Sequence, residues 1–210
     1  MTASQDGLRA QGLVKRFGPR AVIDQIEIHV AAGQVLALVG GNGSGKTTLL
    51  RVLAGLLEPD AGEVTWQGRA LDESDPWVRA QLAILLDDAG AFPDLSVGEH
   101  LELLARAFGV DDPAAAAHHV LDEVGLAGQR DQLPATLSSG QRHRLGLGSV
   151  LVRPAALLVL DEPEQRLDAE GRLWLAGRLR AAADAGTAVV LASHDQAVID
   201  TTADLVLELT

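Results

Sequence analysis

Hydrophobic and polar positions alternate in the first third of the chain. Between residues 21 and 30, Ile26, Ile28 and Val30 are separated by polar side chains, a period of two that indicates a strand covered on one face. Residues 63–71 repeat this alternation more weakly. Two half-buried strands are therefore predicted in this part of the sequence.

Unbroken apolar runs form a second pattern. They occupy residues 35–39, 157–160 and 188–192. A short apolar run without alternation is typical of a strand buried on both faces of a parallel sheet. A further strand is indicated at 205–209. Because the runs alternate with helical stretches, the pattern favours an α/β architecture.

The middle of the chain, residues 76–152, reads mostly as helix. Ser96 and Glu99 have the spacing of a capping box. Asp112 and Pro113 fit an N-cap followed by a first-turn proline. Each pair therefore predicts the start of a helix.

A third helix is predicted over residues 139–151. Since the sequence contains no long linker and no convincing internal repeat, the simplest organisation is a single domain over residues 1–210. Its α/β core would combine residues 1–75 with 153–210. The helical insertion would occupy residues 76–152.

Composition narrows the class of protein. The 210 residues include 29 acidic and 17 basic side chains, a formal charge of −12, which argues against a surface for nucleic acid or an anionic membrane. The chain has no cysteine, which excludes disulfides, thiolate zinc sites and cysteine nucleophiles. No apolar stretch approaches the roughly 18 residues that span a bilayer, and the N-terminus lacks a signal core. A cytoplasmic location is therefore expected.

A glycine-rich loop carries the first chemical signal. Residues 40–48 read GGNGSGKTT, the G-x-x-x-x-G-K-[ST] pattern of a phosphate-binding loop (P-loop, Walker A), between a buried strand and a helical segment. The glycines let consecutive N–H groups point inward, Lys46 neutralises phosphate oxygens, and Thr47 offers a hydroxyl to Mg²⁺. ATP with Mg²⁺ is the predicted ligand. The expected ATP-binding residues of the loop are Gly40, Gly41, Asn42, Gly43, Ser44, Gly45, Lys46, Thr47 and Thr48.

An acidic pair follows one of the buried runs. Residues 156–163 read ALLVLDEP and deliver Asp161 and Glu162 to the carboxyl end of a strand, where ligands of open α/β sheets bind. Beside a phosphate loop, Asp161 fits a carboxylate that holds Mg²⁺, and Glu162 fits a base that polarises the attacking water. Taken alone, the same two acids equally fit caps of a nearby helix.

The segment LSSGQ at residues 137–141 adds a third signal. Ser138 and Gln141 have capping-box spacing, so the segment can present a helix N-terminus and a serine hydroxyl to a phosphate. In isolation, a simple helix cap is the first interpretation of these five residues. It lies between the phosphate loop and ALLVLDEP, and His194 follows later in VVLASH. This order resembles the nucleotide-binding subunit of an ABC transporter, and the resemblance covers nearly the whole chain.

The resemblance implies a P-loop NTPase core with a RecA-like, mostly parallel sheet, an N-terminal antiparallel β subdomain and an inserted helical subdomain. It also implies a dimer in which two copies, or one copy and a homologous cassette, enclose two ATP molecules head to tail. The signature residues expected to touch the γ-phosphate across that dimer are Ser138, Ser139, Gly140 and Gln141. The family usually has glycine where Ser139 stands, and serine retains the N–H donor.

Three more residues receive roles from the resemblance. Asp168 matches the D-loop acid at the dimer interface, and His194 matches a switch histidine that contacts the γ-phosphate. Phe17 matches an aromatic residue that stacks on adenine. The alternatives are a structural, hydrogen-bonding histidine and an ordinary core aromatic. The catalytic set is then Lys46, Glu162 and His194.

One position departs from the family pattern. Aligning the segment that leads into the helical insertion places Asp87 at the Q-loop position, where glutamine is expected; a shift of one residue selects Asp88 instead. A carboxylate can help hold Mg²⁺, but it adds negative charge near the γ-phosphate and donates no hydrogen bond while ionised. Slower hydrolysis, or altered coupling to the membrane partner, is expected.

The sequence therefore predicts an ATP hydrolase that powers a separate integral-membrane permease and is held by it at the inner face of the cell membrane. The sequence ends just after residues 205–209 and leaves no room for the C-terminal regulatory domain of many importer cassettes, which favours export. The alternatives are a haem-exporter-type cassette, a soluble ABC-type ATPase of DNA repair or translation, a cassette that barely hydrolyses ATP, and a small P-loop kinase. No nucleic-acid partner is expected.

Overall fold

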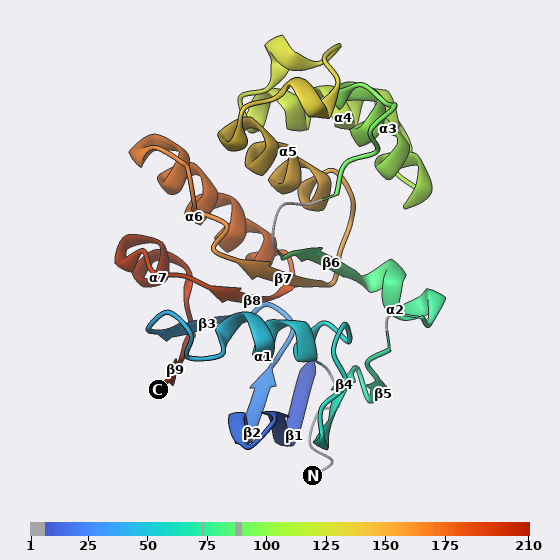
Figure 1. Ribbon diagram of the computed structural model, residues 1–210. Coiled ribbons are helices and arrows are strands. Elements are labelled where there is room, and N and C mark those ends of the chain that lie inside the picture. The colour runs from blue at the N-terminus through green and yellow to red at the C-terminus, as the bar shows by residue number, and fades with distance from the viewer. Residues whose placement is uncertain (1–6, 73, 87–89) are drawn as a thin grey trace. The chain divides into compact units, whose positions relative to one another are not determined.

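The computed structural model describes residues 7–72, 74–86 and 90–210 (Figure 1). The chain divides into two compact units. The core unit consists of residues 1–86, 155–164 and 168–210, and the helical unit consists of residues 87–154 and 165–167. The chain therefore enters the helical unit twice, the second time for only a few residues.

The start of the helical unit differs from the prediction of an insertion over 76–152. Helix α2 (Pro76–Gln81) and strand β6 (Leu82–Leu85) both belong to the core unit, and residues 153–154 belong to the helical unit. The apolar run of β6 is too short for its periodicity to distinguish a strand from a helix. Its pairing with the strand at Leu157–Asp161 decides the matter.

An antiparallel sheet forms one part of the core unit. Its strands are β1 (Leu8–Phe17), β2 (Arg20–Val30), β4 (Ala61–Trp66) and β5 (Arg69–Ala70), in the order β2-β1-β4-β5. The prediction of a strand over residues 21–30 is confirmed. Ile28 and Val30 of β2 are buried while Glu27 and His29 are exposed, as the alternation predicted.

The prediction of a single strand over residues 63–71 was wrong. Strand β4 ends at Trp66 and pairs with β5, and the two are joined by Gln67 and Gly68, with φ of 49° and 76°. Two successive residues at positive φ are typical of a type I′ turn, which reverses the chain between paired strands. The segment is therefore a hairpin, and its glycine supplies a conformation that other residues rarely adopt.

A parallel sheet forms the other part of the core unit. Its strands are β3 (Val35–Gly40), β6, β7 (Leu157–Asp161), β8 (Ala188–Ala192) and β9 (Leu205–Leu209), in the order β6-β7-β8-β3-β9. Every neighbouring pair is parallel. The three unbroken apolar runs and the final strand are confirmed, and all residues of β8 are buried, as expected for a strand inside a covered sheet.

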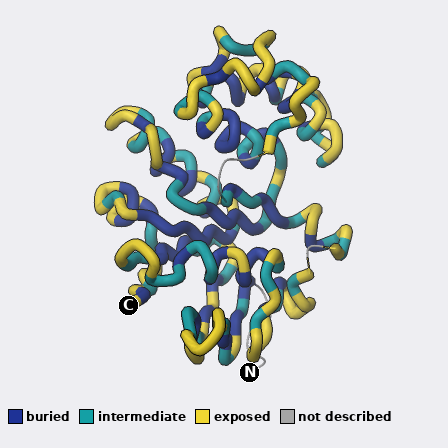
Figure 2. The backbone as a smooth tube through the Cα atoms, in the orientation of Figure 1, coloured by how far each residue is buried: buried dark blue, intermediate teal, exposed yellow. Residues whose placement is uncertain are grey.

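Helices cover the parallel sheet. Helix α1 (Lys46–Leu53) lies between the two sheets, where Leu49, Leu50 and Leu53 join one hydrophobic cluster with residues of both (Figures 1 and 2). Besides α1 and α2, the described residues of the core unit form α6 (Ala169–Asp184) and α7 (Gln196–Thr202), which pack against each other. Because α1 is held by both sheets, the phosphate loop at its N-terminus is fixed to the core.

The helical unit contains three α-helices in its described residues: α3 (Val97–Ala107), α4 (Pro113–Glu123) and α5 (Ser139–Leu151), with short 3₁₀ turns at Ala127–Gln129 and Pro134–Thr136. The predicted caps are confirmed. Ser96 and Glu99 form a reciprocal capping box at α3, and the Asp112 side chain accepts a hydrogen bond from the N–H of Ala115 at α4. None of the helices described in the structure is long and apolar enough to cross a membrane.

Candidate nucleotide-binding site

The predicted site residues of the core unit gather at one edge of the parallel sheet. Strands β3, β7 and β8 run in the same direction, so their carboxyl ends meet there. Loop 40–48 begins at the last residue of β3, Asp161 ends β7 and Glu162 follows it, and His194 comes shortly after β8. Segments far apart in the sequence thus form a single site, as the motif order predicted.

Two glycines give the phosphate loop its shape. Gly40 has φ of 147°, and a side chain there would place Cβ 2.3 Å from the carbonyl oxygen of Leu209. Gly45 has φ of 104°, and its Cβ would lie 2.8 Å from Cγ1 of Val22. Both positions combine a left-handed backbone with no room for a methyl group, so both require glycine.

Lys46 lies within the loop rather than in solvent. It is the first residue of α1 and is only 6% exposed. Its Nζ donates hydrogen bonds to the carbonyl oxygens of Gly40 at 2.8 Å and Gly41 at 3.2 Å. The ammonium group therefore lies beside the first N–H groups of α1, which have no partner within the helix and favour an anion.

Thr47 and Asp161 meet across the site. The Thr47 hydroxyl donates a hydrogen bond of 2.5 Å to Oδ2 of Asp161. Hydroxyl and carboxylate oxygens are the hard ligands that Mg²⁺ prefers, and Mg²⁺ is usually held by few protein ligands together with substrate phosphates. The residues at this point therefore fit the predicted magnesium ion.

Glu162 and His194 form the second side-chain pair at this edge. Oε1 of Glu162 lies 3.1 Å from Nε2 of His194, and both side chains are partly exposed. Glu162 has φ of 46°, in the left-handed region that non-glycine residues seldom occupy. This backbone turn ends the pleat of β7 immediately after Asp161. The structure thus brings together the two residues predicted to act on the attacking water.

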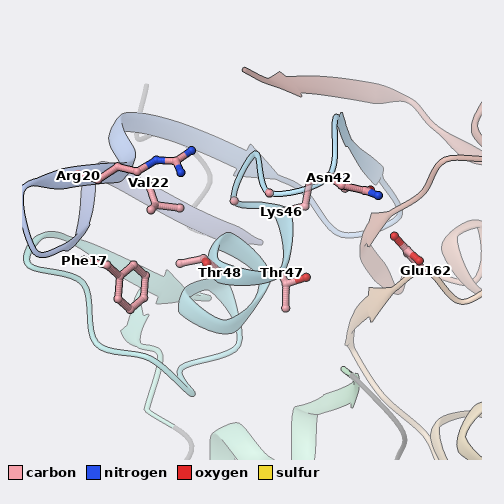
Figure 3. Close-up of a pocket in the computed structure, with 10 residues that line it drawn as sticks. Phe17, Arg20, Val22, Asn42, Lys46, Thr47, Thr48 and Glu162 are labelled. Carbon is pink, nitrogen blue, oxygen red and sulfur yellow. The ribbon is translucent and has the colours of Figure 1, made fainter.

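A pocket of about 520 Å³ extends from the phosphate loop (Figure 3). Phe17 lines it and is 54% exposed, so the alternative of a core aromatic is wrong. Arg20 and Val22 of β2 also line the pocket, and Figure 3 shows the Arg20 side chain extending over it from the β1–β2 hairpin. Neither residue was predicted from the sequence. The register of the hairpin could have indicated Arg20, because it places Arg20 opposite Phe17.

Asp168, a further predicted residue, is not among the residues that line this pocket. Asp168 caps helix α6, where its side chain accepts a hydrogen bond of 2.8 Å from the N–H of Gly171. This local role was not predicted, and it holds the carboxylate at the start of the helix. Asp87, expected at the Q-loop position, lies outside the described residues, and so does Asp88.

The signature segment starts a helix in the helical unit. Ser138 caps α5: its hydroxyl accepts from the N–H of Gln141, whose side chain accepts from the N–H of Ser138. The capping box predicted from the spacing is confirmed. Ser139 and Gly140 occupy the first turn, where backbone N–H groups have no acceptor within the helix. These two groups are the donors that the segment can offer to an anion.

The glycine loop between a buried strand and a helix, with a hydroxyl against a strand-end aspartate, defines the core unit as a P-loop nucleoside triphosphatase. Comparison with known proteins narrows this class. The family model for the ABC transporter matches residues 23–165. The chain therefore belongs to the ABC transporter family and is one of its ATP hydrolases.

Individual relatives agree with this assignment. The cytochrome c biogenesis ATP-binding export protein CcmA 2 of Cupriavidus metallidurans is 43% identical over 161 residues, which are 77% of this chain and 76% of that protein. The aliphatic sulfonates import ATP-binding protein SsuB 1 of Burkholderia lata is 41% identical over 170 residues, 81% of this chain and 50% of that protein. A solved ATP-binding subunit of an ABC transporter is 26% identical, with a TM-score of 0.85 over 97% of this chain and 85% of the other. The predicted fold class is confirmed.

Proposed function

We propose that this chain supplies the energy for a separate integral-membrane permease by binding and hydrolysing ATP at the carboxyl edge of its parallel sheet. The observation that carries the proposal is the pairing of Glu162 with His194, 3.1 Å apart, beside the contact between Thr47 and Asp161. A site that only bound nucleotide would need no base and histidine poised together at its open side.

The phosphate loop would hold the triphosphate. Lys46 and the N–H groups at the start of α1 would neutralise the β- and γ-phosphate oxygens, because both carry positive charge. The Lys46 ammonium group is held within the loop by the carbonyl oxygen of Gly40. Phe17 offers an exposed aromatic face on which adenine stacks at the other end of the pocket. The pocket therefore matches a ligand with a polyanionic end and an aromatic end.

Thr47 and Asp161 would hold Mg²⁺, Thr47 directly and Asp161 as the carboxylate beside it. The ion supplies positive charge that stabilises the phosphate oxygens during transfer. Glu162 would accept a proton from the attacking water, and the Nε2 atom of His194 would keep the Glu162 carboxylate in position. As the γ-phosphate arrives, the imidazole would contact it as well. His194 and Glu162 thus act on the same water from neighbouring strand ends.

A second copy, or a homologous cassette, would complete the site. In that dimer the first turn of α5, at Ser138–Gln141, offers its N–H groups to the γ-phosphate held by the partner's loop. Asp168 would lie at the interface, and Asp87 near the γ-phosphate. Because Asp87 replaces a neutral amide with a carboxylate, slower hydrolysis is expected.

Export is the direction that we propose for the permease. The relatives named as export proteins are matched over 76% and 84% of their length, and those named as import proteins over 50–72%. In either direction the chain would lie at the inner face of the cell membrane, bound there through the permease.

Glu162→Gln tests the proposed chemistry, because it keeps the size of the side chain and removes the base. We expect ATP hydrolysis to fall by about a hundredfold or more, while ATP is still bound. ATP should then accumulate in a closed dimer, which size-exclusion chromatography with ATP and Mg²⁺ would detect.

Asp184→Asn is a matched control, since it makes the same carboxylate-to-amide change on α6 in the core unit, where Asp184 pairs with Arg180. This variant should hydrolyse ATP at the wild-type rate. Wild-type turnover by the Glu162→Gln protein would instead remove Glu162 from its role as the base.

A further inference from the structure

A second glutamate lies buried beside the catalytic pair. Glu164 follows Glu162 by two residues, is only 8% exposed and belongs to the core unit. Its Oε1 atom accepts two hydrogen bonds, one of 2.5 Å from the hydroxyl of Ser193 and one of 3.1 Å from the backbone N–H of His194. The carboxylate therefore contacts the two residues that directly follow β8.

These contacts complete a ring between the ends of β7 and β8. On one side the backbone N–H of Glu162 donates to the carbonyl oxygen of Ala192 at 2.9 Å. On the other side Glu164 binds Ser193 and the backbone of His194, and the side chains of Glu162 and His194 meet outside the ring. The separation of base and histidine is thus set by backbone on one side and by Glu164 on the other.

The histidine needs such an anchor because its side chain is 43% exposed and packing does little to fix it. The turn that carries it is otherwise short: α7 begins at Gln196, and the Ser193 hydroxyl also accepts from the N–H of Asp195 at 3.1 Å. The N–H of Ser193 itself donates to the carbonyl oxygen of Leu38 at 3.3 Å, whereas Glu164 holds the side chain of Ser193 and the backbone N–H that follows it. A small rotation there would move the imidazole away from Glu162.

Glu164 also carries a cost that a merely structural residue would avoid. Its Oε2 atom is buried and has no hydrogen-bond partner among the described residues. A buried polar atom without a hydrogen-bond partner destabilises the fold, and burying a carboxylate costs more free energy than burying a neutral acceptor. Departures of this kind are expected where a site, rather than stability, decides the residue.

We propose that Glu164 is a positioning residue for ATP hydrolysis, which holds the backbone of His194 so that its imidazole stays against Glu162. This inference rests on the proposed roles of Glu162 and His194. It assigns to Glu164 no contact with ATP: the residue acts only through Ser193 and His194. Loss of Glu164 should therefore lower kcat and leave nucleotide binding unchanged.

A double-mutant cycle between Glu164 and His194 is the decisive experiment. Glu164→Ala should lower kcat by roughly tenfold to a hundredfold, the effect of misplacing a catalytic group by about an ångström. KM and the Kd for ATP should stay near the wild-type values. In a His194→Ala background, Glu164→Ala should change kcat by less than about twofold, because the group it positions is already absent.

Two variants separate positioning from a general loss of structure. Glu164→Gln keeps an oxygen that accepts from both donors, so it should restore most of the activity lost in Glu164→Ala. Asp204→Ala is the matched control: Asp204 also accepts a backbone hydrogen bond, 2.8 Å from the N–H of Val35, at the opposite end of β3 from the phosphate loop. It should lower the Tm and leave kcat unchanged.

The outcomes distinguish this inference from the proposed function. If Glu164→Ala lowers kcat equally in the wild-type and His194→Ala backgrounds, Glu164 does not act through His194. The inference then fails, while the proposed roles of Glu162 and His194 stand. If His194→Ala itself hydrolyses ATP at the wild-type rate, the proposed role of His194 fails. Should Glu164→Ala not fold, a cycle of Ser193→Ala with His194→Ala decides, and additive losses overturn the inference.

Discussion

Glu162 shows at the scale of one residue how the site departs from regular structure. A non-glycine residue in the left-handed region costs on the order of 1–3 kcal/mol, and surrounding contacts must hold it there. Here the backbone N–H of Glu162 is bound to Ala192, and its carboxylate meets His194. Such strain, at the residue assigned as the base, is consistent with a position chosen for chemistry.

Phe17 carries a prediction at the same scale. Stacking of a base on an aromatic side chain contributes about 1–3 kcal/mol. Phe17→Ala should therefore raise the Kd for ATP by about tenfold, and for GTP by a similar factor, because stacking uses the face that every base has. Phe17→Tyr should bind like the wild type. Isothermal titration calorimetry would measure the Kd of Phe17→Ala for ATP and for GTP, and the Kd of Phe17→Tyr for ATP.

Phe92→Ala serves as the control for Phe17. Phe92 is also an exposed aromatic residue, but it lies in the helical unit and contacts His100 rather than the nucleotide pocket. Its substitution should leave the Kd for ATP unchanged. Equal Kd values for Phe17→Ala and wild type would show that adenine does not stack on Phe17.

At the scale of secondary-structure elements, a buried histidine joins α3 to α5. His100 of α3 is 2% exposed, and its Nε2 atom lies 2.9 Å from the hydroxyl of Ser149 on α5. That hydroxyl donates its own proton to the carbonyl oxygen of Leu145. Nε2 must therefore carry the proton in this hydrogen bond, which fixes the neutral tautomer of His100.

The stability of the full chain should depend on pH through His100. Burial lowers the pKa of His100 from the ordinary value of 6.5. Below pH 6.5 the unfolded chain binds a proton that the folded chain resists, so the contribution is present above this pH and is lost as the pH falls. His100→Gln should lower the Tm at pH 8, and the difference from wild type should narrow towards pH 5.5.

His119→Gln tests whether the effect belongs to His100. His119 is exposed on α4, where Nε2 lies 3.7 Å from Glu123 one turn later. The Tm difference between this variant and the wild type should stay small across the same pH range. A difference for His100→Gln that did not change with pH would contradict the inferred burial of a neutral imidazole.

At the scale of the whole molecule, an acidic chain must bind a polyanion. The formal charge is −12, and the positive potential is supplied locally by Lys46 and by N–H groups at the starts of α1 and α5. In the proposed dimer the donors of α1 from one copy and of α5 from the other would meet at one ATP, so closure of the dimer is the movement that ATP would drive. A membrane partner bound to the chain would receive that movement.

The proposed direction of transport is tested with the membrane protein that co-purifies with this chain. The two would be purified together and placed in vesicles with the ATPase on the outer surface. ATP added outside should then drive the transported compound into the vesicle lumen. Release of compound from loaded vesicles would mean import. The Lys46→Ala complex should do neither, because its loop lacks the ammonium group.

Local chemistry made much of the site predictable. The phosphate loop, the acids after β7 and the capping box at Ser138 each depend on neighbours within about ten residues, so spacing and residue type were sufficient. The buried strands β3, β7 and β8 were predictable for the same reason, since an unbroken apolar run reflects burial on both faces. The motif order then predicted their assembly at one sheet edge.

Contacts between distant segments were not predictable in this way. Strand β6 was missed because only its pairing with β7 distinguishes it from a helix, and the turn at Gln67 was missed inside an alternating pattern. Arg20 lines the pocket because of hairpin register, and Glu164 meets His194 because two parallel strands end side by side. Both contacts join segments that lie apart in the sequence: the β1–β2 hairpin and the phosphate loop in one case, and the ends of β7 and β8 in the other.

The sequence by itself determined the chemistry available to this protein: a loop for phosphates, a base, a histidine and a second donor segment. Only the tertiary structure decided which of these groups touch and how firmly. The physical reason is that local patterns set conformation through a few neighbouring bonds, whereas distances such as the 3.1 Å between Glu162 and His194 depend on the packing of separate strands.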